Sequence, residues 1–277
     1  MPEIWSAKLL TSLKKNLVAA QPSVVNRNYE GEIAQAGDTV HINSISRPTI
    51  GTYTPNSTTI TPENLTTAQR TLIIDQSKYF AFEVDDVDAR QAAGDMLSAA
   101  LLEAAYGLRD LADQYVISLY AGVDAANALG TVAVPVGTAT AAYDSVLVPL
   151  KVKLDEANVP TEGRYVLVPS WFHGRLLLDA RFIKVNESGT AEGLRNGMVG
   201  RAAGFDILVS NNMPLITGDD YLVLAGHPMA ITYAEQINKV EGYRPENAFS
   251  DAVKGLHLYG AKLVRTNAIA TAVASIT

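Results

Sequence analysis

The sequence predicts an α+β fold, in which one long helix accompanies antiparallel strands and a smaller α/β unit is inserted between them. Three observations lead to this class. Residues 85–122 repeat apolar side chains at helical spacing, residues 40–42 and 80–84 alternate with the period of a strand, and residues 143–209 alternate between the two patterns. Because strand patterns return over residues 229–266, both ends of the chain are expected to build one domain, with the α/β unit as an insertion.

Composition narrows the function before any element is considered. The 277 residues are 48% hydrophobic, which is enough for the cores of about two domains. With no cysteine, the chain has no disulfide, no thiol nucleophile and no thiolate metal site. The net charge of −7 argues against a dedicated grip on nucleic acid phosphates, although not against enclosing DNA. No metal site is expected, because the four histidines are far apart in sequence. They are His41, His173, His227 and His257.

The first element is an amphipathic arm over residues 4–17. Its apolar side chains share one helical face, and its three lysines lie largely off that face: Trp5, Leu9, Leu10, Leu13 and Leu17 against Lys8, Lys14 and Lys15. Docking on protein is favoured over a membrane surface, because three lysines and one tryptophan make a weak membrane helix. No apolar run reaches signal-peptide or membrane-spanning length, so a cytosolic protein is expected.

Residues 46–71 form a threonine-rich stretch between the predicted strands at residues 40–42 and 80–84, which are expected to pair at its base. It holds three prolines and only four sizeable apolar side chains, so ordering it costs more conformational entropy than its own burial returns. It is therefore disordered or held by something outside the subunit. As a hairpin of about 13 residues per arm, it would project about 40 Å and reach a neighbouring copy. The predicted inter-subunit contacts are Arg47, Ile50, Tyr53, Ile60, Leu65, Arg70 and, in the arm, Trp5.

Residues 85–122 are predicted to form one spine helix about 54 Å long. Asp85 is expected near its N-cap, where negative charge meets the positive end of the helix dipole, and Gly122 is expected as a left-handed stop. The buried stripe is predicted to contain Leu97, Leu101, Ala104, Leu108, Leu111, Tyr115 and Leu119.

The inserted unit is expected to begin after a weakly patterned crossing segment. A helix is predicted over residues 143–158, with a start as late as Val146 allowed because Pro149 suits a first turn best. A buried strand follows over residues 164–168. Ser170 is predicted to cap a helix that runs to Leu178, and residues 205–209 return as a strand.

Five glycines at positions 187–204 offer the one opening for an enzyme, because glycine-rich turns can cradle phosphates. The series lacks the GxxxxGK[ST] and GxGxxG spacings and holds no lysine, so a glycine-rich loop is favoured over a phosphate site. The last strands are predicted to be long and antiparallel, with a bulge at Gly260 and a further strand or edge segment in the tail AIATAVA.

The order of these elements resembles that of the major capsid proteins of tailed bacteriophages. GDTVHINSI and TLIIDQSKYFAFEVDDVDARQA resemble the base of that family's extended loop leading into its spine helix. YVLVPSWFHGRLLLDARF and GRAAGFDILVSNNMP resemble its inserted axial domain. The fold, shared with encapsulins and the herpesvirus capsid floor, would divide the chain into an N-terminal arm (1–28), an extended β-hairpin loop with its base (29–84), a peripheral domain (85–135 and 226–277) and an axial domain (136–225).

This resemblance implies a structural protein with no catalytic residue, cofactor or metal. It would self-assemble as pentamers and hexamers into an icosahedral shell, with the axial domain around the symmetry axes and the hairpin over the adjacent subunit. The shell would enclose DNA without sequence-specific binding or membrane contact. A portal and, because the chain starts directly at the arm, a separate scaffolding protein are the expected partners. The protein would occur in the virion, after assembly in the host cytoplasm.

Two alternatives stay open on the sequence alone. An encapsulin-type compartment shell would share the fold but hold a cargo enzyme, and a phosphate-binding enzyme would use the glycines at 187–204. If the chain is a capsid protein, its shell is not expected to be covalently crosslinked. A family member joins a hairpin lysine to a neighbour's asparagine, whereas no lysine occurs here between Lys15 and Lys78.

Overall fold

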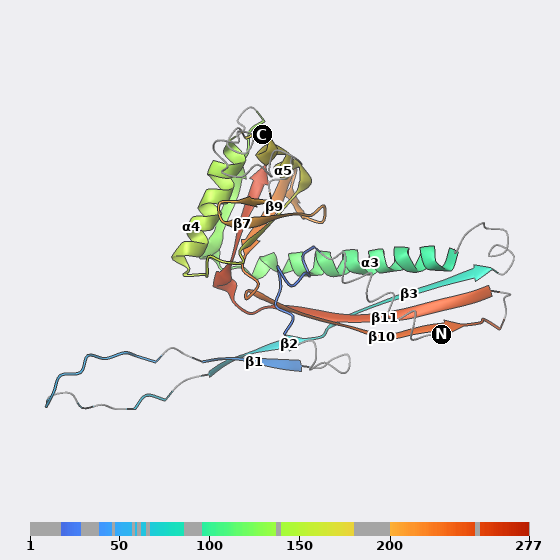
Figure 1. The fold of residues 1–277 in the computed structure, drawn as a ribbon, viewed down its shortest axis with the longest axis horizontal. Coiled ribbons are helices and arrows are strands. Elements are labelled where there is room, and N and C mark those ends of the chain that lie inside the picture. The colour runs from blue at the N-terminus through green and yellow to red at the C-terminus, as the bar shows by residue number, and fades with distance from the viewer. Residues whose placement is uncertain are drawn as a thin grey trace.

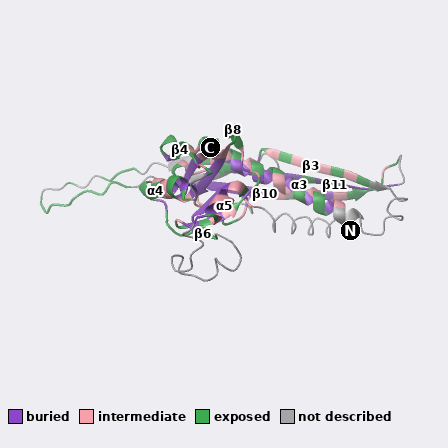
Figure 2. Ribbon diagram, turned by 90° about the horizontal axis from the view of Figure 1, so that it is seen from above, coloured by how far each residue is buried: buried purple, intermediate pink, exposed green. Residues whose placement is uncertain are grey.

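The computed structural model describes residues 18–28, 39–45, 48–56, 59, 62–64, 67–85, 96–136, 140–179, 200–246 and 250–276. These residues form three parts (Figure 1): a long helix lying along a sheet, an α/β unit standing at one end of that helix, and a two-stranded hairpin. The hairpin extends away from the body in the direction opposite to that of the sheet. Buried residues concentrate in the α/β unit and along the contact between helix and sheet, whereas the hairpin is exposed (Figure 2).

The peripheral sheet has three antiparallel strands in the order β10 (Ile231–Tyr243), β11 (Ser250–Leu263) and β3 (Gln76–Asp85). Helix α3 (Met96–Ser118) lies along it (Figure 1). The two are joined by an apolar cluster that contains Leu101, Ala105, Leu108, Val240 and Val253, with Phe80 and Phe82 packed against it. The sheet therefore buries one face against the helix.

Helix α3 differs from its prediction at both ends. Asp85 is the last residue of β3 and pairs with Ser250, so it does not cap the helix, and residues 86–95 lie outside the described residues. The last turn is the 3₁₀ helix η2 (Leu119–Gly122), and Gly122 is not among the glycines with positive φ. The predictions of a helix beginning at Asp85 and of a left-handed stop at Gly122 are therefore wrong.

The buried stripe of α3 is also turned relative to the prediction. Leu101, Leu108 and the small Ala105 and Ala112 are buried, whereas Leu111 is 43% exposed. The residues of α3 that are buried are therefore those that face its neighbours, including small alanines, and not simply its largest apolar side chains.

The hairpin is built on β1 (Thr39–Ile45) and β2 (Thr67–Ile73), which pair antiparallel with each other. The sequence predicted that residues 80–84 would pair with residues 40–42 at this base, but β3 pairs with β11 instead. The chain leaves β2 across Gly260, where an added Cβ would lie 2.4 Å from the Ile73 carbonyl oxygen. Gly260 thus permits a close backbone approach, and the predicted bulge lies instead between Ile237 and Lys239 on β10.

The α/β unit is built on a seven-stranded mixed sheet in the order β4-β12-β9-β5-β7-β6, with β8 on β9. The bounds are β4 (Ala128–Ala133), β5 (Tyr165–Val168), β6 (Arg201–Ala202), β7 (Phe205–Val209), β8 (Leu215–Thr217), β9 (Asp220–Gly226) and β12 (Ile269–Ser275). Strand β12 was expected with the peripheral strands, but it lies inside this sheet, antiparallel to β9 and parallel to β4. Its small, nearly continuously buried residues suit an internal strand.

Helices close this sheet much as the sequence predicted. The π-helix η4 (Ala142–Leu147) continues into α4 (Val148–Glu156), with Pro149 in the first turn of α4, and α4 packs against β12 and β9. Helix α5 (Ser170–Leu177) begins one residue early, because its N-cap is Pro169 and Ser170 makes no capping bond. Their inward side chains are fully buried: Val146, Leu150, Leu154, Phe172 and Leu176.

Candidate subunit interface

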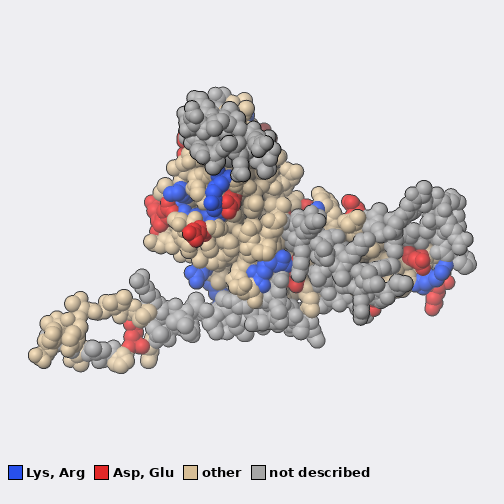
Figure 3. Space-filling model, in the orientation of Figure 1, with Lys and Arg blue, Asp and Glu red and all other residues tan. Residues whose placement is uncertain are grey.

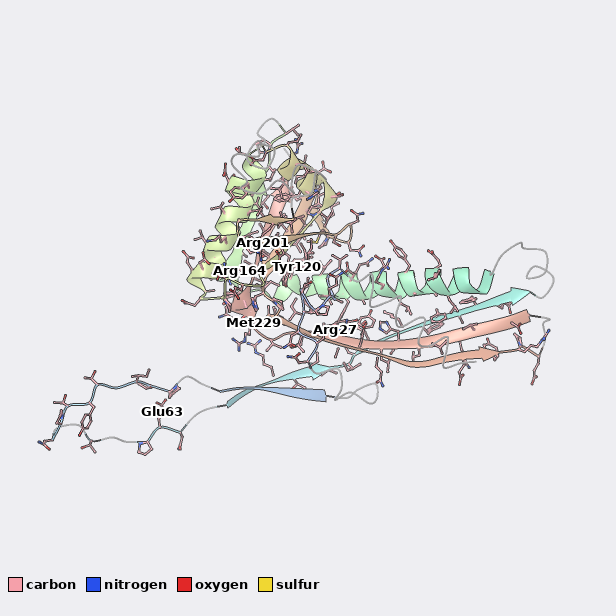
Figure 4. All side chains as sticks on the ribbon, in the orientation of Figure 1. Arg27, Glu63, Tyr120, Arg164, Arg201 and Met229 are labelled. Carbon is pink, nitrogen blue, oxygen red and sulfur yellow. The ribbon has the colours of Figure 1, made fainter. Side chains whose placement is uncertain are left out.

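The hairpin tip carries two strongly exposed large apolar side chains. Ile50 is 83% exposed and Tyr53 is 63% exposed. The backbone N–H of Thr49 donates to Glu63 Oε2 across the two arms at 3.0 Å (Figure 4 labels Glu63). The tip is uncharged in Figure 3 apart from a small acidic patch, so the surface it offers to a partner is mainly apolar and hydroxyl-bearing.

The predicted contact residues fall into three groups. Ile50 and Tyr53 lie on the exposed tip, as their prediction requires. Arg70 is exposed, but its Nη1 donates to the Leu263 carbonyl oxygen of its own chain at 3.2 Å, so it also ties the hairpin to β11. The others, Arg47, Ile60, Leu65 and Trp5, lie outside the described residues.

A small apolar cluster fixes the base of the hairpin on the peripheral sheet. Leu72 and Ile74 are buried together with Ala234 on β10 and Leu258 on β11. The Tyr115 hydroxyl of α3 donates to Asp75 Oδ1 at 3.0 Å, and burial, with help from this carboxylate, raises the Tyr115 pKa to about 12. The hairpin therefore leaves the body in a direction set by helix and sheet together.

The chain from Val18 to Asn28 is bound to the same body. The Asn26 N–H donates to the Ile231 carbonyl oxygen at 2.8 Å, and the Tyr233 N–H donates to the Asn26 carbonyl oxygen at 2.9 Å. The next residue, Arg27, forms an ion pair with Glu235 of β10 and lies beneath α3 (Figure 4). Asn26 thus forms an isolated parallel β-bridge with Thr232 beside the start of β10.

Glu235 is a buried carboxylate that holds this segment. Its side chain is 2% exposed, and it accepts a hydrogen bond from the Tyr233 hydroxyl at 2.8 Å and faces His257 Nε2 at 3.4 Å. Burial alone would raise the pKa of Glu235, but His257, Arg27 and the Tyr233 hydroxyl outweigh it and lower that pKa to about 2. The carboxylate is therefore ionised at neutral pH and binds the segment by charge.

Asp113 joins helix α3 to the N-terminal segment and to the α/β unit. Only 3% exposed, it accepts a hydrogen bond from the Ala19 N–H at 2.5 Å, from Ser210 Oγ at 3.3 Å and from Asn212 Nδ2 at 3.1 Å. Asn212 Nδ2 also donates to Asp110 Oδ1 at 2.7 Å. One helix face therefore holds the N-terminal segment and the β7–β8 turn of the α/β unit.

No role was predicted from the sequence for either carboxylate, since Asp113 lies off the predicted apolar stripe of the helix and Glu235 lies within a predicted strand. Their partners are distant in sequence, and no local pattern signals them. Asp113 does fall off the predicted stripe, but so do the solvated charges of the helix.

The described ranges contain no cluster of three or more potential metal-ligating side chains and no helix long and apolar enough to cross a membrane. Of the glycine-rich stretch at 187–204, only residues 200–204 are described.

Arg164, 2% exposed, donates to Asp155 and to the carbonyl oxygens of Val159 and Pro160, so it braces the loop between α4 and β5.

Comparison with known proteins gives a consistent set of matches. A family model described as phage capsid protein matches residues 66–272. The structure of Mycobacterium phage Che8 is 32% identical, with a TM-score of 0.75 over 93% of this chain and 91% of that one. The capsid of cyanophage P-SCSP1u (19% identity, TM-score 0.68, 88% and 85% coverage) and that of Ralstonia phage GP4 (14%, 0.66, 95% and 90%) share the fold. None of the curated proteins matches.

Proposed function

The chain belongs to the phage capsid protein family, and we propose that it builds the shell by laying its hairpin on a neighbouring copy of itself. It is a major capsid protein that forms the shell of a tailed bacteriophage, as its sequence led us to expect. This family favours the phage shell over the encapsulin-type compartment and over the phosphate-binding enzyme.

The exposed tip carries this proposal. Full burial of a side chain such as Ile50 or Tyr53 is worth about 2 kcal/mol, and a tip that extends into solvent forgoes most of it. A second copy that covers the tip supplies this free energy, which contributes, together with other contacts along the hairpin, toward the ordering cost of residues 46–71. Arg47, Ile60, Leu65 and Arg70 join the proposed contact. Because Arg70 already binds its own β11, its share in a subunit contact is the smaller one.

The domain division is part of the same proposal. Residues 136–225 build the axial domain around the five-fold and six-fold axes of pentamers and hexamers, joined there by β4 and β12. The α3 helix and the strands β3, β10 and β11 then form the peripheral domain. The α/β unit stands at the end of α3 from which the hairpin departs, which suits an arrangement where one part faces an axis and the other reaches a neighbour (Figure 1).

The remaining partners follow from charge and family. A net charge of −7 suits a wall that encloses DNA without holding it. A separate scaffolding protein and a portal stay predictions, as does assembly in the host cytoplasm before the protein enters the virion. Purification of assembling particles, followed by mass spectrometry of what co-purifies, tests these partners.

The family is a structural one, and we propose that the chain carries no catalysis and needs no metal or nucleotide. Calorimetric titration with ATP and GTP, together with elemental analysis of the purified protein, tests this. A stoichiometric metal, or a nucleotide Kd below about 100 μM, would mean that the glycine stretch at 187–204 had been misread.

Replacement of residues 48–64 by a short Gly-Ser turn tests the role of the hairpin. Because β1 and β2 still pair, the subunit should keep its circular dichroism spectrum and melting temperature while sedimentation shows no shells. A matched control keeps Ile50 and Tyr53 and replaces only the polar residues between and after them; it should still assemble. Shells from the shortened chain would remove the assembly role, and an unfolded monomer would place the hairpin in the subunit's own core.

A further inference from the structure

One flank of α3 is covered in its C-terminal half and bare in its N-terminal half. At about 100° per residue, Leu102, Tyr106, Asp113 and Ile117 fall within about 60° of one another around the helix. Asp113 is 3% exposed and Ile117 is 2% exposed, and the segment beginning at Val18 contacts this end through the Ala19 N–H. Leu102 and Tyr106, on the same flank, are each 53% exposed.

The chain that would cover the bare half is the stretch directly before Val18. Residues 4–17 carry five apolar side chains on one helical face. As a helix, residues 5–17 would be about 18 Å long, and the distance along α3 from Asp113 to Leu102 is about 16 Å. Because Val18 already lies at the covered end, no linker is needed for this stretch to continue along the flank.

Charge fits the same placement. If the stretch runs parallel to α3 and continues from the contact of Ala19 with Asp113, Lys15 falls beside Asp110 and Lys8 beside Glu103. Lys8 and Lys15 are seven residues apart, and so are Glu103 and Asp110. Both lysines therefore share a flank of one helix, and both carboxylates share a flank of the other. Two apolar surfaces and two pairs of opposite charges would therefore meet in one register.

We propose that residues 4–17 dock as a helix along the Leu102 and Tyr106 flank of α3 in their own subunit. The guanidinium carbon of Arg109 lies 4.4 Å from the Tyr106 ring centroid, a cation–π contact within α3 that holds this ring on the helix surface. Trp5 then contacts its own chain, in place of the neighbouring subunit expected from the sequence. The proposal concerns the single subunit and does not depend on the shell role of the hairpin.

Crosslinking tests which chain supplies the helix. Because the chain has no cysteine, Lys8→Cys combined with Glu103→Cys introduces the only two thiols. A short bifunctional maleimide should join them within one chain, which leaves a monomer band on a denaturing gel and consumes both thiols by mass. The control, Lys8→Cys with Glu156→Cys on α4, should not form this intrachain link. Dimer bands from the first pair would assign the helix to another copy, and no link at all would place it elsewhere; either result overturns the proposal.

Protease access tests the flank itself. Leu102→Ser with Tyr106→Ser should speed tryptic cleavage after Lys8, Lys14 and Lys15 by about tenfold, because the docked helix loses its apolar surface. Leu111→Ser is the matched control, since this leucine lies about 180° away on the same helix and is 43% exposed. Unchanged cleavage in the double variant, or an equal rise in the control at unchanged melting temperature, would contradict the docking.

Discussion

Acid should weaken the binding of the N-terminal segment to the peripheral sheet through one carboxylate, Glu235. Its pKa is lowered from 4.5 to about 2 in the folded chain, a difference equivalent to about 3 kcal/mol of stability. Because the folded pKa lies below the unfolded one, this contribution is fully present above about pH 5 and is lost as the pH falls toward 2. At pH 3 about 2 kcal/mol of it should be gone.

The assay is urea unfolding of the unassembled subunit with the shortened hairpin, followed by circular dichroism at pH 7 and pH 3. Glu235→Gln removes the charge but keeps a polar side chain beside the Tyr233 hydroxyl. It should be less stable at pH 7 by about 3 kcal/mol, because the Arg27 guanidinium loses a buried counter-charge. Its further loss on going to pH 3 should be smaller than that of the parent by about 2 kcal/mol.

Glu241→Gln is the matched control for this prediction. It is the same substitution on the same strand, but Glu241 pairs with Lys254 at 3.2 Å near the surface, where an ion pair is worth at most about 1 kcal/mol. Its pH dependence should follow the parent. If Glu235→Gln shows the parent's pH dependence as well, the ionised carboxylate does not hold the segment and the reasoning is refuted.

Three further predictions concern packing, linkage and assembly. Gly260→Ala should destabilise the subunit by about 1–3 kcal/mol, because its Cβ would meet the Ile73 carbonyl oxygen. Gly107→Ala should stabilise the subunit by up to about 1 kcal/mol, because its Cβ would lie in open space on α3. Thermal melts of the two variants measure both changes. Boiled shells should run as one band near 29.6 kDa, and a ladder of multimers would reveal covalent links between subunits. Arg47→Glu with Arg70→Glu should weaken assembly more at low salt than at high salt, as measured by sedimentation, and a salt-independent loss would show that these arginines do not meet carboxylates.

Local patterns were sufficient for much of the fold. Pro149 in a first turn, the buried strand before Ser170 and the long helix each depend on spacing within one segment, and the structure has all three. The order of these elements was enough to indicate the family. The exposed tip with Ile50 and Tyr53 was foreseen in the same way, since it is a stretch too poor in apolar residues to form its own core.

The errors concern pairing over long distances. The pattern of residues 269–275 predicts a strand but cannot say which sheet it enters, and β12 joined β9 of the α/β unit. Likewise, the pattern of residues 80–84 predicts a strand but not its partner, and β3 pairs with β11. Asp113 is buried by partners more than 90 residues away in sequence, so its local pattern resembled that of a solvated charge.

The central claim is that the hairpin of one subunit lies on another. A cryo-electron microscopy map of the assembled particle tests it most directly, because it shows what surrounds Ile50 and Tyr53, now 83% and 63% exposed in the single chain. Both side chains should be buried against a neighbouring subunit's peripheral domain. A map in which both remain in solvent, or fold back on their own chain, would contradict it.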